Sequence, residues 1–155
     1  MISPVEDVDR IMAVMAAAFD PAYGEAWNRR QVEDALLVGN CHYLLIGVEG
    51  KPLEQDSPAA GFSLTRRSMD EEELLLFAVI PQFRHRGFGR RMLDRLAEDA
   101  RDRGISRIIL EMRRGNPAEK LYRNFGFTPV GERPKYYHGI NGEAIDAITF
   151  AYTIE

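Results

Sequence analysis

Cysteine, long apolar runs and an excess of positive charge are all missing from this sequence. One of the 155 residues is a cysteine, Cys41, which excludes an internal disulfide and a cysteine-only metal site. So little cysteine is typical of a reducing compartment, and we expect a cytoplasmic protein. No apolar run approaches the roughly 20 residues that a membrane-spanning helix needs, so no membrane partner is expected. The sequence has no basic stretch followed by an apolar one, so a signal peptide is not expected.

Net charge and histidine spacing argue against two further classes of site. Asp plus Glu number 24 and Lys plus Arg number 20, a net charge of −4 at pH 7, which argues against a nucleic-acid partner. His42, His85 and His138 have no metal-ligand spacing with one another or with Cys41, so no metal is expected. The length suits one domain with a buried core, and we predict a single domain over 1–155.

Hydrophobic periodicity predicts a mixed α/β domain with the element order ααβββαβαββ. The first helix is expected to begin at Ser3 with Pro4, and the second to begin at Asn28 and stop at Gly39. The expected strands cover 43–48, 60–64, 74–80, 107–112, 127–130 and 144–154, and two further helices cover 87–103 and 116–126. The first three strands suggest an antiparallel meander. The continuous apolar run 74–80 predicts a strand buried on both faces.

A glycine-bearing loop joins that apolar run to the next helix. Its sequence is Arg84-His85-Arg86-Gly87-Phe88-Gly89-Arg90-Arg91. The first amides of a helix lack internal partners and the helix dipole is positive there, so such an end binds phosphate, and glycine lets the backbone approach an anion. The loop lacks the third glycine of a dinucleotide fingerprint and the Gly-Lys-Ser/Thr of a P-loop. Its residues therefore fit either an anion-binding loop or a tightly packed helix start with solvated arginines.

The loop resembles the coenzyme A pyrophosphate motif, Arg/Gln-x-x-Gly-x-Gly/Ala, of the GNAT superfamily of acyl-CoA N-acyltransferases. The likeness continues through Leu110-Glu111-Met112-Arg113, Asn116 and Leu121-Tyr122-Arg123-Asn124-Phe125-Gly126-Phe127. Trp27-Asn28 and Arg133-Pro134-Lys135-Tyr136-Tyr137 are similar to the ribosomal-protein-alanine, or RimI-like, N-terminal acetyltransferases. The resemblance implies the GNAT fold: a mixed central sheet with helices on both faces and a splayed strand pair that binds acyl-CoA.

The implied reaction is attack of an amine on a thioester, which requires a base, an oxyanion donor and an acid. An α-amine has a pKa of roughly 8 and is mostly protonated at neutral pH, so a base must take its proton. The resemblance assigns this role to Glu111; without it, Glu111 reads as a strand-end carboxylate paired with Arg113 or Arg114. Glu73 is the rival base, although the acidic run 70–73 also fits a solvated turn or an attractor of basic peptides.

The resemblance also assigns the remaining site residues. Tyr122 is the candidate acid, with core packing as its alternative role, and the oxyanion donor is a main-chain amide near Val79. Trp27, Tyr136 and Tyr137 are expected to shape the acceptor site, with packing on a sheet as the alternative role of the two tyrosines. Coenzyme binding is expected to use Phe77, Val79, Arg84, His85, Arg86, Gly87, Phe88, Gly89, Arg90, Asn116 and Tyr122.

The sequence therefore favours an acetyl-CoA-dependent N-acetyltransferase without a metal, monomeric or homodimeric, acting on a protein N-terminal α-amine such as that of a ribosomal protein. A small-molecule acceptor (a polyamine, an amino acid or an aminoglycoside) is the first alternative, because Ala144-Ile145 replaces an acidic residue that RimI-like relatives carry before Asp146. A non-catalytic acyl-CoA-binding module is the second.

Overall fold

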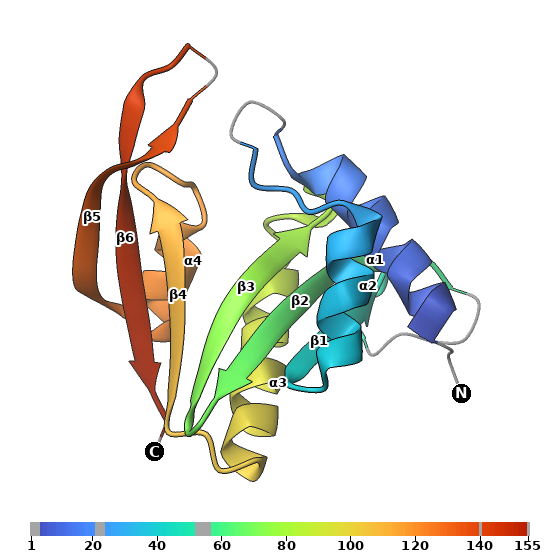
Figure 1. Cartoon of the computed structure of the whole chain (residues 1–155). Coiled ribbons are helices and arrows are strands. Elements are labelled where there is room, and N and C mark those ends of the chain that lie inside the picture. The colour runs from blue at the N-terminus through green and yellow to red at the C-terminus, as the bar shows by residue number, and fades with distance from the viewer. Residues whose placement is uncertain (1–3, 21–23, 52–56, 140, 155) are drawn as a thin grey trace.

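A computed structural model describes residues 4–20, 24–51, 57–139 and 141–154 of the chain (Figure 1). Its helices are α1 (Pro4–Ala18), α2 (Arg29–Val38), α3 (Phe88–Asp102) and α4 (Glu119–Phe125), with a 3-10 turn, η2, at Pro81–Phe83. Its strands are β1 (Cys41–Gly47), β2 (Ala59–Ser68), β3 (Glu71–Val79), β4 (Arg107–Arg113), β5 (Thr128–His138) and β6 (Ala144–Thr153). The predicted order of helices and strands is confirmed.

The strands form one mixed sheet in the order β1-β2-β3-β4-β6-β5. Strands β1 to β3 are antiparallel neighbours, which confirms the predicted meander. Strands β3 and β4 are parallel, and α3 is the crossover that a parallel pair requires. Strand β6 then pairs with β4 on one side and β5 on the other, antiparallel to both.

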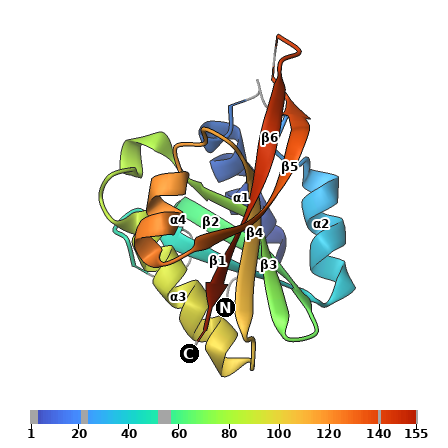
Figure 2. The same ribbon diagram turned by 90° about the vertical axis from the view of Figure 1, so that its left-hand side faces the viewer.

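Helices cover both faces of this sheet, as the family resemblance implies (Figures 1 and 2). Helices α1 and α2 lie on one face, over a core that includes Val8, Ile11, Val32, Phe62, Leu64 and Leu76. Helices α3 and α4 lie on the other, over Leu93, Leu96, Ile108, Leu110, Tyr122 and Phe150. The sheet is therefore covered by apolar side chains on both faces.

Strands β3 and β4 separate part of the way along β3. Their pairing ends where Leu74 lies opposite Leu110. Directly beyond, β3 carries one extra residue, Leu75, because Leu74 and Leu76 lie opposite consecutive residues of β2. An extra residue bends a strand and increases its local twist, and Figure 1 shows β3 and β4 diverging toward one end. The splayed strand pair implied by the resemblance is therefore present.

The run 74–80 is not buried on both faces, so that prediction is wrong. Burial along β3 alternates, and Leu75 and Phe77 are partly exposed. The divergence of β4 removes the neighbouring strand whose side chains would cover them.

The interpretation of 70–73 as a solvated turn is wrong for its last three residues. Glu71 to Glu73 are the first residues of β3, and Glu72 is fully buried. Each carboxylate pairs with an arginine from a neighbouring element: Glu71 with Arg107, Glu72 with Arg103 and Glu73 with Arg66. These ion pairs let acidic residues stand in a strand.

The predicted start of one helix agrees with the structure and that of another does not. Asn28 begins α2 with a full capping box, as predicted: its side chain accepts from the Gln31 amide at 2.8 Å and the Gln31 side chain accepts from the Asn28 amide. Helix α4 begins at Glu119 and not at Asn116, whose side-chain oxygen instead accepts from the Ala118 amide at 2.9 Å in the preceding turn. The predicted cap at Ser3 lies outside the described residues.

Strand β5 continues to His138, well past the end predicted at 130. A bulge between Arg133 and Tyr137, with Lys135 at a φ of 58°, carries the strand past Pro134. The β5–β6 hairpin consequently extends beyond the end of β4, whose last residue, Arg113, pairs with Ala147. A proline and a bulge interrupt the alternating pattern by which a strand is predicted from sequence, so the continuation of β5 could not be predicted.

Candidate active site

The gap between β3 and β4 exposes main-chain groups of β3. The Ile80 amide donates to the Ala60 carbonyl of β2 at 2.8 Å. Antiparallel strands alternate the direction of their hydrogen bonds, so Phe77 and Val79 direct their main-chain groups away from β2 and toward the gap. Since β4 no longer pairs there, an extended ligand can bond to these groups as an added strand does.

The glycine loop lies at the start of α3, next to the end of β3. Gly87 is the N-terminal cap of α3 with a φ of 83°, and no side chain of the described residues caps this end. A Cβ on Gly87 would meet nothing within 4 Å, whereas one on Gly89 would lie 2.8 Å from Leu121 Cδ2 of α4. Gly87 is thus needed for its backbone conformation and Gly89 for close packing of α3 and α4. The open amides of α3 make an anion-binding end.

The arginines of the loop divide into two groups. Arg84 donates to the main-chain carbonyls of Val79 and Ala18 at 3.0 Å each, so its guanidinium fastens the loop to β3 and α1. Arg91, the last residue of the loop sequence, donates to the Gly50 carbonyl at 3.0 Å.

Arg86, Arg90 and His85 of the loop are exposed. Arg86 lies 5.9 Å from the ring centre of Phe83, and Arg90 lies 4.9 Å from that of Phe125 and 3.5 Å from Asp94. His85 is exposed with a φ of 63°. Below them, Phe88 is buried and stacks on Phe83 with ring centres 5.6 Å apart. The exposed cations can therefore meet a phosphate, whereas Phe88 supports the loop from within.

Glu111 lies on β4, one residue past the last pair with β3. Its side chain is 20% exposed, 3.2 Å from the Arg133 Nε of β5. The Thr149 hydroxyl donates to the same carboxylate oxygen at 3.5 Å. Residues of the two neighbouring strands, Arg133 of β5 and Thr149 of β6, therefore hold this carboxylate.

Tyr122 approaches the same region from α4. Its ring meets those of Phe77 and Phe127 edge-on, at 5.8 Å and 5.6 Å between centres. Burial, followed by the charge of Glu25, raises the pKa of the Tyr122 hydroxyl, which therefore carries its proton at neutral pH. The Tyr122 side chain therefore packs in the core and also lies beside β3.

Glu73, the rival base, lies where β3 and β4 are still paired, opposite Ile109. Its carboxylate accepts from Arg66 at 2.8 Å. It stands before the point of divergence, whereas Glu111 stands after it, so the gap is flanked by Glu111 and Tyr122 and not by Glu73.

Two segments border the open end of the gap: residues 24–28 before α2 and the β5–β6 hairpin (Figure 1). Trp27 is half-buried against the core under α1 and α2. Tyr136 is 49% exposed and meets Tyr137 edge-on at 5.2 Å, with the Arg133 guanidinium 4.9 Å from its ring centre. Burial, then the charges of Glu111 and Glu25, raises the pKa of Tyr137 to about 12.

Glu25 is a candidate site residue that sequence reasoning missed. Its carboxylate lies 3.4 Å from the Arg113 Nε at the end of β4, and its charge acts on both Tyr122 and Tyr137. The two partners are 88 residues apart in sequence, and Glu25 belongs to no helical or strand repeat. No signal in the sequence could have found it.

The described parts of the chain contain neither a group of metal-ligating side chains nor a helix that could span a membrane. Among those residues, no group of three His, Cys, Asp or Glu side chains is placed to hold a metal ion. No helix within the same ranges has the length and apolar character that crossing a bilayer requires.

Comparison with known proteins agrees with this geometry. Residues 8–127 match the model of the acetyltransferase (GNAT) family. A ribosomal protein bS18-alanine N-acetyltransferase of Salmonella typhimurium is 37% identical over 103 residues, 66% of this chain and 69% of that protein.

Solved structures show the same likeness. The crystal structure of the ribosomal-protein-S18-alanine N-acetyltransferase of Escherichia coli matches with a TM-score of 0.82 at 25% identity, over 99% of this chain and 91% of that one. An aminoglycoside 6'-N-acetyltransferase complexed with coenzyme A shares the fold, with a TM-score of 0.76 at 18% identity over 99% and 93% of the two chains. The chain therefore belongs to the GNAT family of acetyltransferases and is an enzyme similar to the ribosomal-protein-alanine N-acetyltransferases.

Proposed function

We propose that the enzyme transfers an acetyl group from acetyl-CoA directly to the α-amine of a protein N-terminus, with a ribosomal protein as acceptor. The observation that carries the proposal is the position of Glu111 and Tyr122 on two elements that flank the gap, beside the part of β3 that does not pair with β4. The names of the relatives from Salmonella typhimurium and Escherichia coli support this acceptor, which also implies a cytoplasmic enzyme.

The residues of the gap and the loop fit acetyl-CoA by their chemistry. The open amides at Gly87 and the exposed Arg86 and Arg90 suit the pyrophosphate, and the main chain of Phe77 and Val79 suits an extended amide-bearing arm. When bound, acetyl-CoA supplies an activated thioester. A neighbour of the same fold complexed with coenzyme A supports this choice.

This chain offers one group for each chemical requirement of the transfer: a base, an oxyanion donor and an acid. Glu111, directly or through a water, would take the proton of the acceptor ammonium. The Val79 amide would donate to the oxyanion that develops on the carbonyl, because a main-chain donor is already fixed in place. Tyr122, protonated at neutral pH, would give its proton to the leaving thiolate.

A peptide acceptor is favoured over the small-molecule alternative, because Ala144 and Ile145 stand beside the acceptor aromatics. Ile145 lies opposite Tyr137 in the hairpin, so neither position 144 nor position 145 offers a carboxylate to hold a second ammonium. Asp146 is engaged elsewhere, accepting from the Lys135 amide at 2.9 Å. These two apolar residues are better suited to the side chain of a peptide than to a polyamine.

Mass spectrometry of an acetyl-CoA reaction with a peptide pool tests the acceptor. The pool pairs free and blocked N-termini, with lysines in both, and includes a polyamine. Acetylation of free N-termini alone is the expected result. Acetylation of the polyamine alone would keep the mechanism but replace the acceptor, and coenzyme binding without transfer to any amine would support a binding module.

Glu111→Gln tests the base. If Glu111 takes the proton, the variant should lose about 10²–10⁴ in turnover while its thermal midpoint changes little. Glu73→Gln is the matched control, since it alters the rival carboxylate on the neighbouring strand. Loss of activity in Glu73→Gln with activity kept in Glu111→Gln would contradict the assignment.

A further inference from the structure

A separate cavity lies between the C-terminal half of α3 and strands β1 and β2. It encloses about 440 Å³, within the size range of small-molecule pockets. Its lining includes His42, Ser63, Thr65, Leu96, Asp99 and Asp102. The coenzyme loop is at the opposite end of α3, so this cavity belongs to neither the gap nor the loop.

The floor of the cavity holds a hydroxyl that lacks a partner. Ser63 is fully buried, and within the described chain its Oγ is the single buried side-chain oxygen or nitrogen without a hydrogen bond. Buried polar groups are nearly always paired, so an unpaired one that lines a cavity indicates a group that enters from outside. The hydroxyl can both donate and accept.

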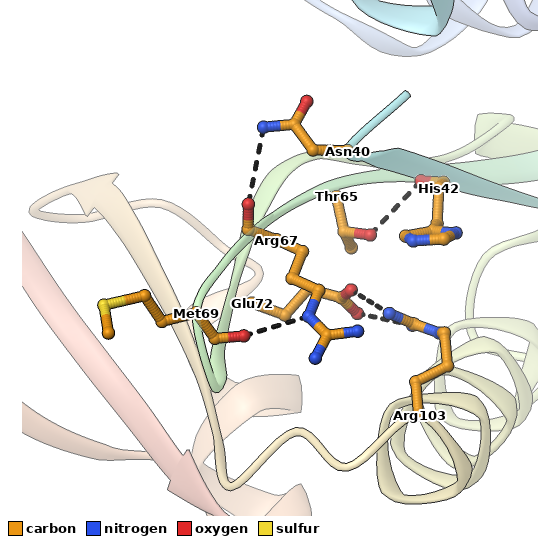
Figure 3. A network of polar contacts seen from close by, with 7 residues as sticks. All are labelled: Asn40, His42, Thr65, Arg67, Met69, Glu72 and Arg103. Carbon is orange, nitrogen blue, oxygen red and sulfur yellow. Dashed lines mark hydrogen bonds and ion pairs between the residues drawn. The ribbon is translucent and has the colours of Figure 1, made fainter. Parts of the chain in front are cut away.

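The basic groups of this region are already engaged or neutral. Arg103 makes two hydrogen bonds to the carboxylate of Glu72, at 2.5 Å and 2.8 Å, as Figure 3 shows. Burial, then the charge of Arg103, lowers the pKa of His42, so its imidazole is neutral at pH 7. Arg67, nearby, is exposed and donates to the Met69 carbonyl at 2.9 Å (Figure 3). An anion would find no free cation in this lining.

The acceptor groups, in contrast, are available. Asp99 and Asp102 stand three positions apart on α3, a spacing that places two side chains on one face of a helix. Both are exposed at the rim, and neither carboxylate makes a hydrogen bond or an ion pair with the described residues, although the charge of Asp99 acts on His42 and Arg103 of the same lining. Thr65 uses its proton on the His42 carbonyl at 3.2 Å (Figure 3), which leaves its oxygen as an acceptor. Leu96 adds an apolar wall.

We propose that this cavity binds a small organic cation, an alkyl ammonium or guanidinium whose head lies between Asp99 and Asp102 and whose far polar end hydrogen-bonds to Ser63. The carboxylates supply charge at the rim, Leu96 supports the alkyl stem, and the partner of Ser63 is the far end of the ligand. The site is distinct from the acetyl-transfer site and does not depend on which amine is acetylated.

Amide chemical shifts of the full chain, titrated with agmatine and 1,4-diaminobutane in the absence of acetyl-CoA, test the proposal. We expect saturable shifts at Ser63, Thr65 and Asp99. 1,4-Butanediol and succinate serve as neutral and anionic controls and should leave these amides unchanged. Equal shifts with the diol, no saturable shift, or shifts confined to the gap between β3 and β4 would each overturn the proposal.

Variants separate the two ends of the site. Asp99→Asn with Asp102→Asn should weaken binding of either cation about tenfold, by the loss of two exposed charge pairs. Glu98→Gln, on the neighbouring face of the same helix, lines a different cavity and should not change it. Ser63→Ala removes a hydroxyl that has no partner in the folded protein, so it should fold normally and weaken binding about threefold, by the loss of one hydrogen bond. Unchanged affinity in both pocket variants would contradict the assignment.

Discussion

At the residue scale, Tyr122 combines two tasks in separate atoms. Its ring packs on Phe77 and Phe127, and only its hydroxyl can act as an acid. Tyr122→Phe should therefore keep the thermal midpoint within a few degrees and lower turnover by about 10²-fold or more. Tyr152→Phe, in the same aromatic cluster, is the matched control. Equal turnover in both variants would mean that Tyr122 only packs.

Glu25 carries a prediction about the acceptor. Its carboxylate is partly exposed at the open end of the gap, close to Tyr137 and Arg113. A carboxylate there attracts the acceptor ammonium, so Glu25→Gln should raise the KM for a peptide severalfold and leave the KM for acetyl-CoA unchanged. Glu33→Gln, an exposed change on α2, provides the comparison. A shift in the acetyl-CoA KM alone would place the effect of Glu25 on the coenzyme side.

At the element scale, α3 has glycines with positive φ near both of its ends. Gly87 has a φ of 83° and Gly104 a φ of 80°, and a Cβ on either meets nothing within 4 Å. Alanine at each position therefore adds only backbone strain, about 1–2 kcal/mol of unfolding free energy in both variants. Urea unfolding should give equal losses for Gly87→Ala and Gly104→Ala.

The same pair isolates the function of the loop. Gly87 sets the direction of the first amides of α3, while Gly104 lies beyond its other end, so only Gly87→Ala should raise the KM for acetyl-CoA. A parallel rise in Gly104→Ala would show that reduced stability, and not loop geometry, causes the loss.

At the scale of the whole molecule, local signals were predictable and long-range pairings were not. The capping box at Asn28 and the stop at Gly39 are set by neighbours in sequence, and both are present. The bulge at Leu75 depends on the register with β2, so the burial of β3 could not be read from its own residues.

Ion pairing between elements also determines which charged residues are buried. Glu72 is buried only because Arg103 reaches it from another element. The catalytic assignment of Glu111 and Tyr122 came from resemblance and stays a prediction, as does the single domain.

The pH dependence of stability belongs to the whole molecule because tyrosines from separate elements contribute to it. Burial and a hydrogen bond to Asp7 raise the pKa of Tyr43 to about 12, and burial with nearby carboxylates raises that of Tyr137 to about 12. In the unfolded chain both hydroxyls lose their protons near the ordinary value of about 10. The folded state thus holds protons that the unfolded state releases.

The stabilisation from these tyrosines is complete below pH 10 or so and should be lost as the pH rises toward about 12. Urea midpoints should be level through neutral and mildly alkaline pH and then fall over this window. Tyr43→Phe should lower the midpoint at neutral pH, because Asp7 loses a hydrogen-bond donor, yet flatten the alkaline decline. A decline that begins near neutral pH, or an equally steep one in Tyr43→Phe, would assign the alkaline loss to other groups.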